Sequence, residues 1–398
     1  MKIAVIGPKG LPAKQGGIEH NGAEIYSRMV SQGHSVDLFA RSSYINSNWF
    51  DRYEWEGVQV IALPTLRLRG IDAFFSSALG AIAACRSRYD IVHFHALGPS
   101  LFSWIPRLLS YFTNAKVVVT CHGLDWRRAK WGRLSSTLIR LGESAAVRFA
   151  HSIIVVSQDL EYYFVKKYGR PTVYIPNAPA KYADSDTSFS YGASLGLTPN
   201  KYVLFLGRLV PEKRPDLLLR AFTSLNLKGW KLVLVGGTSD TNAFMSQLWS
   251  MAAEREDIVF TGELRGRRLA EIVRGAGLFT LPSDLEGLPL VMLEAMREGR
   301  PILASNIPAH QQLLGQERGV LFKAGDLNAL IRCLEWAVRN PQDLADRAKR
   351  AQHHVRVHYD WDIIATKTIN LYNHLLHPVL AQAETSGTPK SLVSQNQK

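Results

Sequence analysis

The sequence predicts an α/β fold made of two doubly wound parallel sheets that face each other across a cleft. Short runs of aliphatic and β-branched residues alternate with longer helical patterns along most of the chain. This alternation is typical of parallel sheets whose two faces are covered by crossover helices. The chain has 398 residues, which is too long for one ordinary core and enough for two α/β domains with sizeable apolar interiors.

The first half of the chain contains one set of predicted strands. They are Ile3–Ile6, Val36–Phe39, Ile91–Phe94, Val117–Thr120 and Ile153–Val156. The alternation then breaks into a polar stretch over residues 184–188, after the segment Pro176-Asn177-Ala178-Pro179. Because clusters of turn-forming and polar residues favour linkers, we place an N-terminal domain at residues 1–178.

A second alternation follows in the other half of the chain. Its predicted strands are Val203–Leu206, Leu232–Val235, Ile258–Phe260, Leu278–Leu281 and Ile302–Ala304. The pattern between Leu327 and Leu376 is mostly helical. We place a C-terminal domain at residues 179–359 and expect a helix at about 360–377 to complete the N-terminal domain. Residues 381–398 are polar and predict a disordered tail.

Composition indicates a soluble globular protein. Hydrophobic residues make up 46% of the chain and charged residues 20%, which is ordinary for that class. The longest apolar stretch, Ala73–Cys85, is shorter than the roughly 20 residues that span a bilayer. Residues 1–7 enter a strand pattern directly, so we expect no secretion signal.

Cysteine usage and net charge bound the surroundings of the protein. Cys85, Cys121 and Cys333 lie far apart without metal-ligand spacing, which favours neither a disulfide framework nor a zinc site and suits a reducing cytoplasm. The net charge of +13 favours an anionic partner, which could be nucleic acid, a phosphorylated substrate or the anionic face of a membrane. Charge alone does not choose among them.

A glycine-rich loop follows the first predicted strand. It runs from Gly7 to Gly17, ends on the pair Gly16-Gly17 and leads into a helix near Ile18 to Gln32. Paired glycines let a backbone approach a phosphate or sugar, and a helix N-terminus offers free N–H groups, although an ordinary turn would also use glycine. The spacing matches neither GxGxxG nor GxxxxGK[ST], which argues against a dinucleotide fold or a P-loop kinase.

A second loop, at residues 207–213, carries two cations directly after a predicted strand. Arg208 and Lys213 could converge on one anionic group, with arginine as a planar fork and lysine as a point charge. Two isolated charges would more often belong to a solvated loop. Their position at the carboxyl end of a strand favours ligand binding instead.

A third segment, at residues 283–295, contains two acids around a predicted helix start. Pro289 suits a first helical turn and Gly287 permits a tight bend, so the N–H groups of residues 287–291 could form an anion cradle. Glu286 stands just before this cradle and Glu294 about a turn beyond it. Helix-dipole stabilisation or a solvated helix face would explain each acid singly, but not the pair together with the glycine and proline between them.

These motifs resemble a known family. Glu286 and Glu294 have the spacing of the E-x7-E signature of retaining glycosyltransferases with the GT-B fold, and the match with glycosyltransferase family 4 (group 1) is close. The resemblance covers nearly the whole chain to about Leu376. Further motifs that carry it are Gly207-Arg208 with Lys213, Thr120-Cys121-His122-Gly123, Asp90-Ile91-Val92-His93, Ile175-Pro176-Asn177 and Val235-Gly236-Gly237.

A weaker resemblance to bacterial rhamnosyltransferase-like members lies in the loop at residues 10–19. That subgroup usually has an aromatic residue before the paired glycines, where this chain has Gln15.

The resemblance implies a GT-B protein with two Rossmann-like domains and a donor site in the second. Arg208 and Lys213 match the pair that holds the donor diphosphate, and Glu294 matches the acid that hydrogen-bonds the ribose hydroxyls. Glu286 matches a residue that contacts the donor sugar and phosphates. The backbone segment beside it supplies further donor contacts, at Gly287, Leu288 and Leu290.

Other family positions complete the predicted site. His122 matches a histidine at the sugar end of the cleft, whereas His93 and His95 fit structural roles better. Gly16 and Gly17 match the glycine loop beneath the diphosphate, and Leu264 lies in a segment whose backbone reads the nucleobase. The predicted catalytic residues are His122, Glu286, Arg208 and Lys213.

The activity implied is transfer of a hexose-type sugar, with its configuration retained, from a nucleoside diphosphate sugar to a glycan or lipid-linked glycan acceptor. Bacterial surface or exopolysaccharide biosynthesis is the expected setting. No cofactor or metal is expected, since the two cations and the helix start can stabilise the leaving diphosphate. Front-face attack is implied rather than a covalent carboxylate intermediate.

We expect a cytoplasmic protein, with the inner face of the plasma membrane as a candidate partner. The aromatic and basic stretch at residues 126–133 could dock an anionic lipid phosphate, and a solvated loop is an equal alternative.

Two other functions are compatible with the sequence. A nucleotide-sugar 2-epimerase would share the fold and need no acceptor. A basic protein that binds nucleic acid would use the positive charge, but the basic residues are scattered and match no nucleic-acid module. The donor sugar, its base, the acceptor and the oligomeric state stay open.

Overall fold

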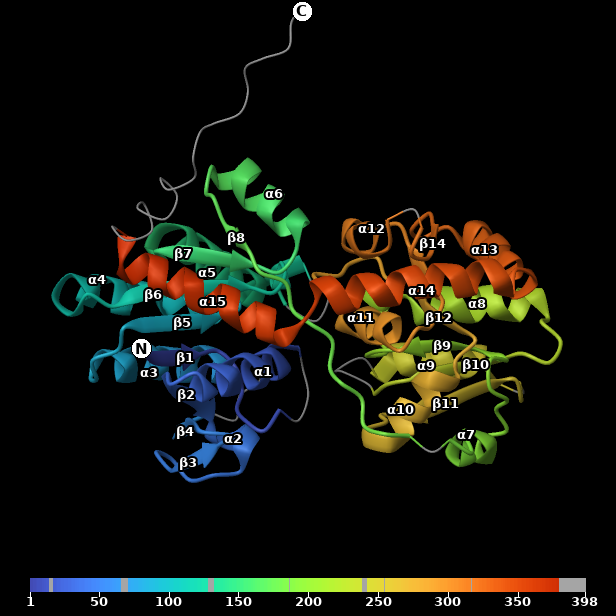
Figure 1. Cartoon of the computed structure of the whole chain (residues 1–398), viewed down its shortest axis with the longest axis horizontal. Coiled ribbons are helices and arrows are strands. Elements are labelled where there is room, and N and C mark those ends of the chain that lie inside the picture. The colour runs from blue at the N-terminus through green and yellow to red at the C-terminus, as the bar shows by residue number, and fades with distance from the viewer. Residues whose placement is uncertain are drawn as a thin grey trace, which may run out of the picture.

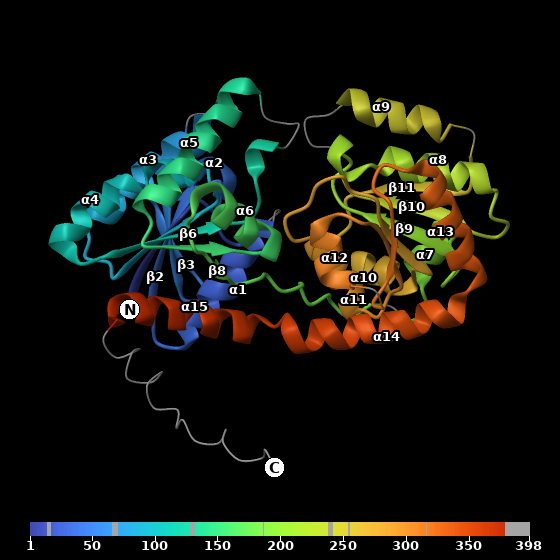
Figure 2. The ribbon, with the colours of Figure 1, turned by 90° about the horizontal axis from the view of Figure 1, so that it is seen from above.

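The computed structural model describes residues 1–13, 17–65, 71–127, 132–185, 187–237, 242–253, 255–315 and 317–378. It contains two sheets that lie side by side, each with helices packed on both faces (Figures 1 and 2). The predicted tail at 381–398 lies outside the described residues.

The first sheet has eight strands within these ranges, in the order β3-β4-β2-β1-β5-β6-β7-β8. Neighbouring strands are parallel except β3 and β4, which form an antiparallel hairpin at one edge. The strands are β1 (Lys2–Ile6), β2 (Ser35–Arg41), β3 (Arg52–Trp55), β4 (Val58–Leu63), β5 (Ile91–His95), β6 (Lys116–Cys121), β7 (Ser152–Val155) and β8 (Val173–Tyr174).

Helices cover both faces of this sheet. One side carries α3, α4 and α5, and α1 lies on the opposite side (Figure 2). The helical elements are α1 (Gly17–Ser31), α2 (Ser42–Ile45), α3 (Ile71–Cys85), η1 (Pro99–Phe102), α4 (Trp104–Thr113), η2 (Asp125–Arg127), α5 (Arg133–Phe149) and α6 (Gln158–Tyr168).

The second sheet has six strands in the described residues, all parallel, in the order β11-β10-β9-β12-β13-β14. They are β9 (Tyr202–Leu206), β10 (Lys231–Val235), β11 (Ile258–Gly262), β12 (Leu278–Leu281), β13 (Ile302–Ser305) and β14 (Val320–Phe322). The helical elements are α7 (Ser190–Ser194), η3 (Pro211–Lys213), α8 (Pro215–Leu225), α9 (Asn242–Met251), α10 (Gly266–Gly275), α11 (Leu290–Arg297), α12 (Pro308–Leu314), α13 (Leu327–Arg339), α14 (Pro341–His358) and α15 (Trp361–Leu376).

The central strands are largely apolar because helices bury both faces of the sheets. Val203, Leu204 and Phe205 of β9, for example, have no exposed surface. The predicted α/β fold with two doubly wound sheets is therefore confirmed, and each predicted strand lies within an observed strand or overlaps one. The edge strands β3, β8 and β14 were not predicted, and neither was β4, which lies between β3 and β2.

The last two helices run from the second sheet back to the first (Figure 1). Helix α14 packs on α11, and α15 packs on α1. The turn between them is stabilised by Asp360, whose carboxylate accepts hydrogen bonds from the backbone N–H groups of Asp362 and Ile363 at the start of α15. The domain limits at 178/179 and 359/360 stay predictions.

Within the described ranges, none of the helices combines the length and hydropathy that crossing a bilayer requires. Helix α3, which contains the longest apolar stretch of the sequence, has 15 residues and packs against β1 and α4.

Candidate active site

Both sheets have a point at which the strand order reverses direction. In the first sheet it lies between β1 and β5, and in the second between β9 and β12. Open α/β sheets bind ligands beyond the carboxyl ends of the strands at such points. The loops that follow β1, β9 and β12 carry most of the predicted site residues, and His122 follows β6.

The centre of the candidate site is an ion pair between Lys213 and Glu286. The Lys213 ammonium lies 2.5 Å from Glu286 Oε1, and each side chain is only 13% exposed. Burial alone would raise the pKa of the Glu286 carboxyl, but the charge and hydrogen bond of Lys213 lower this pKa below its usual value. Glu286 is therefore held as an anion.

A series of buried hydrogen bonds holds Glu286 in place. Ser283 donates its hydroxyl to Glu286 Oε1 at 2.9 Å. Its carbonyl in turn accepts a 2.5 Å hydrogen bond from the hydroxyl of Ser305, and His310 Nδ1 lies 2.9 Å from the carbonyl oxygen of Ser305. Burial lowers the pKa of His310 to about 4, so its imidazole is neutral. These hydrogen bonds fix the loop that carries Glu286.

Close backbone packing places Lys213. The Gly207 carbonyl occupies the space that a side chain at Gly236 would need, which brings the loops after β9 and β10 together. The Lys213 side chain folds back over Gly207, with its Cδ 3.3 Å from the position of a β-carbon there. Asp284 also joins the loops after β9 and β12. Its N–H donates to the Glu212 carbonyl at 2.9 Å, and its carboxylate forms an ion pair with Arg214.

The two halves of the molecule meet at Gly287. A β-carbon at this position would overlap the carbonyl oxygen of His122, so only glycine permits the contact. The neighbouring Leu288 packs against both hydrophobic core clusters, the smaller of which belongs to the first half. A β-carbon at Gly17, in the first turn of α1, would lie 3.1 Å from Leu290 Cδ1. The contact between the two halves thus brings together five of the predicted site residues: His122 and Gly17 from the first half, and Gly287, Leu288 and Leu290 from the second.

Glu294 lies apart from the Lys213–Glu286 pair, on α11. Its Oε2 accepts a 2.7 Å hydrogen bond from the hydroxyl of Tyr182, in the segment that joins the two sheets. Burial raises the pKa of Glu294 to about 7, although hydrogen bonds from Tyr182 and the backbone of Ala180 act in the opposite direction. Sequence reasoning did not identify Tyr182, because the linker pattern gives no sign of which strand end it crosses.

Pro289 was predicted in the first turn of α11, and the structure corrects this. The helix begins at Leu290, and Pro289 is the capping residue in an extended conformation. Its carbonyl accepts the N–H groups of Met292 and Leu293, so the ring precedes the helix and its acceptor opens the hydrogen-bond ladder.

Behind His122 lies a buried chain of histidines and tyrosines. His122 Nε2 is 3.1 Å from His95 Nδ1, and their rings are stacked. His95 Nε2 contacts the Tyr26 hydroxyl at 2.5 Å, and this hydroxyl lies 2.8 Å from His93 Nδ1. His93 also reaches the hydroxyl of Tyr372 on α15, at 2.6 Å.

Burial keeps the histidines of this chain neutral. It lowers the pKa of His93 to about 3 and holds that of His95 well below its usual value. The sequence interpretation treated both as structural and did not connect them to His122. Alternation along β5 places residues two apart on one face of the sheet, and this spacing could have indicated that His93 and His95 act together.

The remaining predicted residues fall in different places. Arg208 is half-buried in the loop after β9, next to Gly207. Leu264 follows β11 and packs against the larger hydrophobic core cluster. Gly16 lies outside the described residues, as do residues 128–131 of the predicted membrane-docking stretch. Trp126 of that stretch donates its indole N–H to buried Glu143 at 2.7 Å.

The arrangement suits an anionic ligand with a polar, uncharged part. Lys213 supplies a positive charge already neutralised by Glu286, so an incoming phosphate would share this cation with the carboxylate. The start of α11 adds backbone N–H groups nearby. His122, held by neutral His95, can exchange hydrogen bonds with a hydroxyl.

Sequence comparisons match both halves of the chain to family models. Residues 193–354 match the model for glycosyl transferases group 1, and residues 16–178 match the model for a glycosyl transferase 4-like domain. A D-inositol 3-phosphate glycosyltransferase of Gordonia bronchialis is 24% identical over 99% of this chain and 93% of its own. A phosphatidyl-myo-inositol mannosyltransferase of Mycobacterium leprae is 28% identical over 94% of this chain and 96% of its own.

Solved structures share the fold. Sucrose-phosphate synthase from Thermosynechococcus elongatus superimposes with a TM-score of 0.79 at 22% identity, covering 95% of this chain and 99% of that one. Anabaena HepE in complex with UDP-glucose superimposes with a TM-score of 0.74 at 20% identity, covering 96% of this chain and all of HepE.

Proposed function

Because the chain belongs to the group 1 family of glycosyl transferases and has the GT-B fold, we propose that it transfers a hexose-type sugar from a nucleoside diphosphate donor to a hydroxyl of a glycan or lipid-linked acceptor. The observation that carries this proposal is the position of the Lys213–Glu286 pair. Glu286 directly precedes Gly287, which contacts His122 of the other half. A diphosphate bound at the pair and the sugar attached to it would therefore reach both halves.

The donor would lie over the carboxyl ends of β9 and β12. Lys213 and Arg208 would hold its diphosphate, and the N–H groups at the start of α11 would add to the positive potential. Glu294 would accept hydrogen bonds from the ribose, and the backbone at Leu264 would contact the base. The complex of HepE with UDP-glucose supports a nucleotide-sugar donor, since HepE shares the fold.

Departure of the diphosphate is the step that these residues would assist. The bond between the anomeric carbon and the phosphate oxygen breaks, and negative charge grows on the diphosphate next to Lys213 and Arg208. The acceptor oxygen bonds to the anomeric carbon from the same face, and its proton passes to the departing phosphate oxygen. The configuration is thereby retained. These cations supply the charge stabilisation that a metal would otherwise give.

Glu286 and His122 would orient the sugar rather than attack it. Since Lys213 and Ser283 both engage Glu286 Oε1, the carboxylate is already committed to hydrogen bonds that fix its position. Glu286 Oε2 can then accept a sugar hydroxyl. His122, backed by His95, would contact the sugar from the side of the first sheet.

The acceptor side is supported by the relatives. The Mycobacterium leprae relative is named for a phosphatidyl-inositol acceptor, which is a lipid. We propose a lipid-linked glycan acceptor at the cytoplasmic face of a membrane and a role in bacterial surface polysaccharide synthesis.

The test is a screen of UDP-, GDP- and dTDP-sugars for thermal stabilisation of the protein, since a ligand that binds only the folded state raises the melting temperature. We expect one donor class to stabilise. Incubation of that donor with lipid-linked glycans should then give a product whose anomeric configuration, read by NMR, equals that of the donor. An inverted product would refute the retaining mechanism, and isomerised donor in the absence of acceptor would identify an epimerase.

A further inference from the structure

Helix α4 presents its apolar side to solvent. Trp104, Leu108, Tyr111 and Phe112 recur with helical spacing on one face, and all are exposed, Phe112 to 87%. The positions that α4 buries are Pro106 and Ser110. A helix of a soluble domain normally has the reverse distribution, so this face is built for a contact outside the first sheet.

Helix α5 extends the same surface. It packs beside α4 on one side of the first sheet (Figure 2), and it exposes Leu134 and Leu141, which are two helical turns apart. We call the exposed residues Trp104, Leu108, Tyr111, Phe112, Leu134 and Leu141 the α4–α5 face.

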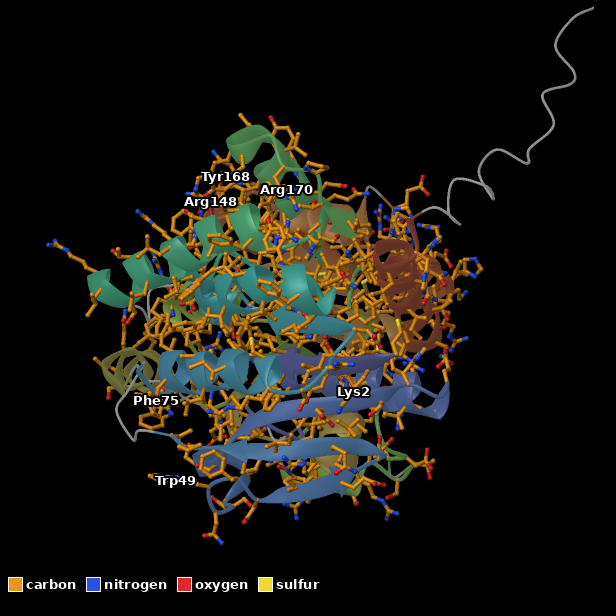
Figure 3. All side chains as sticks on the ribbon, turned by 90° about the vertical axis from the view of Figure 1, so that its left-hand side faces the viewer. Lys2, Trp49, Phe75, Arg148, Tyr168 and Arg170 are labelled. Carbon is orange, nitrogen blue, oxygen red and sulfur yellow. The ribbon has the colours of Figure 1, made fainter. Side chains whose placement is uncertain are left out.

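Cations border the α4–α5 face. Arg140 and Arg148 are exposed on α5, and Arg86 and Arg88 are exposed after α3, in a segment that lies against the second half of α4. Figure 3 looks onto this end of the molecule and shows Arg148 near Arg170, whose guanidinium caps the carbonyls of Ala150 and His151 after α5.

Exposed acidic side chains are absent from the described residues of α4 and α5, although Asp90 is exposed in the segment after α3. Helix α4 contains none, and the single acid of α5 is Glu143. Glu143 is fully buried and is bonded to Trp126, Lys167 and two tyrosines. The described part of these two helices therefore offers cations and no exposed carboxylate. The opposite side of the sheet differs, because α15 there exposes Asp362 to 80%.

We propose that the α4–α5 face docks on the surface of an anionic lipid bilayer. Aromatic and leucine side chains would enter the interfacial region, and the bordering arginines would contact lipid phosphates. Charge selects this occupant over a second copy of the chain, because a copy would place the same arginines against one another without exposed acids on α4 or α5 to pair them. The proposal does not depend on which sugar is transferred.

The surface is also well placed for the chemistry. Helix α5 contacts η2, which follows His122 by three residues. Docking through the α4–α5 face would therefore bring the sugar end of the candidate site near the membrane, where a lipid-linked acceptor is held.

Vesicle flotation of the full chain tests the proposal. The protein would be mixed, without donor, with vesicles of phosphatidylcholine alone or of equal parts phosphatidylcholine and phosphatidylglycerol. We expect binding to the anionic vesicles only, with partial release by high salt. The double variant Tyr111→Ser/Phe112→Ser should bind about 10-fold or more weakly, because two exposed aromatic side chains no longer enter the interface. Arg148→Glu should also weaken binding.

Matched controls separate docking from general surface effects. Trp249→Ser removes an aromatic side chain that is 56% exposed on α9, and Arg339→Glu reverses an exposed charge on α13. Both should bind as the wild type does. Equal binding by wild type and the Tyr111→Ser/Phe112→Ser variant would overturn the proposal. So would failure of the wild type to bind, or a dimer in sedimentation that this variant abolishes, which would make the face a self-association surface. Failure of the donor screen would leave these results unaffected.

Discussion

Lys213 and Glu286 come from loops after different strands of the second sheet and meet with their charged atoms 2.5 Å apart and largely buried. A pair so removed from water holds each partner in place for the other. Removing one partner leaves the other as a buried, uncompensated charge, which costs roughly 3–5 kcal/mol. The pair thus links the stability of the second half to its proposed chemistry.

The first prediction concerns Lys213. Lys213→Ala should lower turnover on the order of 10²-fold at saturating donor, because it removes a charge beside the departing diphosphate. Steady-state kinetics measure this. Lys201→Ala is the control. Lys201 directly precedes β9, whereas Lys213 lies in the loop after β9, so this change should leave turnover unchanged. Near-normal turnover of Lys213→Ala would show that the diphosphate is held elsewhere.

The second prediction concerns the pH dependence of stability through Glu294. Its pKa in the folded protein, about 7, lies above that of an ordinary glutamate. The associated stabilisation is therefore complete below the unfolded pKa and is lost as pH rises through about 7. Urea unfolding should show the wild type losing stability relative to Glu294→Gln over this range. Glu335→Gln changes a half-exposed glutamate on α13 and should keep the wild-type profile. An identical profile for Glu294→Gln would contradict the prediction.

The third prediction concerns donor affinity. Glu294→Ala should weaken donor binding more than it lowers turnover, since a ribose contact is made before and during reaction alike. Calorimetric titration with the donor found in the screen measures the affinity. Unchanged affinity would remove Glu294 from the donor site.

The fourth prediction concerns the contact between the two halves. Gly287→Ala should reduce turnover strongly, because the added methyl group overlaps the His122 carbonyl and separates the two sheets locally. Gly132→Ala, where a methyl group meets nothing within 4 Å, serves as the control. If Gly287→Ala turned over normally, the contact with His122 would not belong to the active arrangement.

The fifth prediction concerns the buried hydroxyl of Tyr26. Tyr26→Phe should destabilise the protein by about 1–3 kcal/mol, because His93 and His95 lose a shared hydrogen-bond partner inside the core. Urea unfolding gives the value. Tyr162→Phe changes an exposed tyrosine on α6 and should have no measurable effect, and equal stability of Tyr26→Phe would mean that the histidines find another partner.

The sequence was sufficient for ten parallel strands of the two sheets, whose continuous apolar runs leave little choice of structure, but not for the two-residue β8 and the three-residue β14. It was insufficient for β3, because this antiparallel edge strand is half exposed and its residues alternate. The neighbouring β4 is almost fully buried, and its apolar run was overlooked. The candidate site was predicted by loop position, which is why Lys213 and Glu286 were both identified. Their pairing with each other was not predicted, since a motif gives the residues of a site but not the contacts that they make before a ligand arrives.

Long-range contacts were the least predictable. Nothing in the local pattern around Tyr372 or Tyr182 indicates that these side chains reach His93 and Glu294, because each contact joins segments more than 100 residues apart. Such pairs depend on the path of the chain between the two halves rather than on a motif.

The position of α15 at the end of the chain affects the order in which the two halves can fold. Its Tyr372 completes the hydrogen bonds of His93 in the first sheet, yet it is synthesised after the whole of the second sheet. Until α15 leaves the ribosome, α1 covers that side of the first sheet without its partner helix, and His93 lacks its contact with Tyr372. The half that is translated first is thus the last to complete its tertiary contacts.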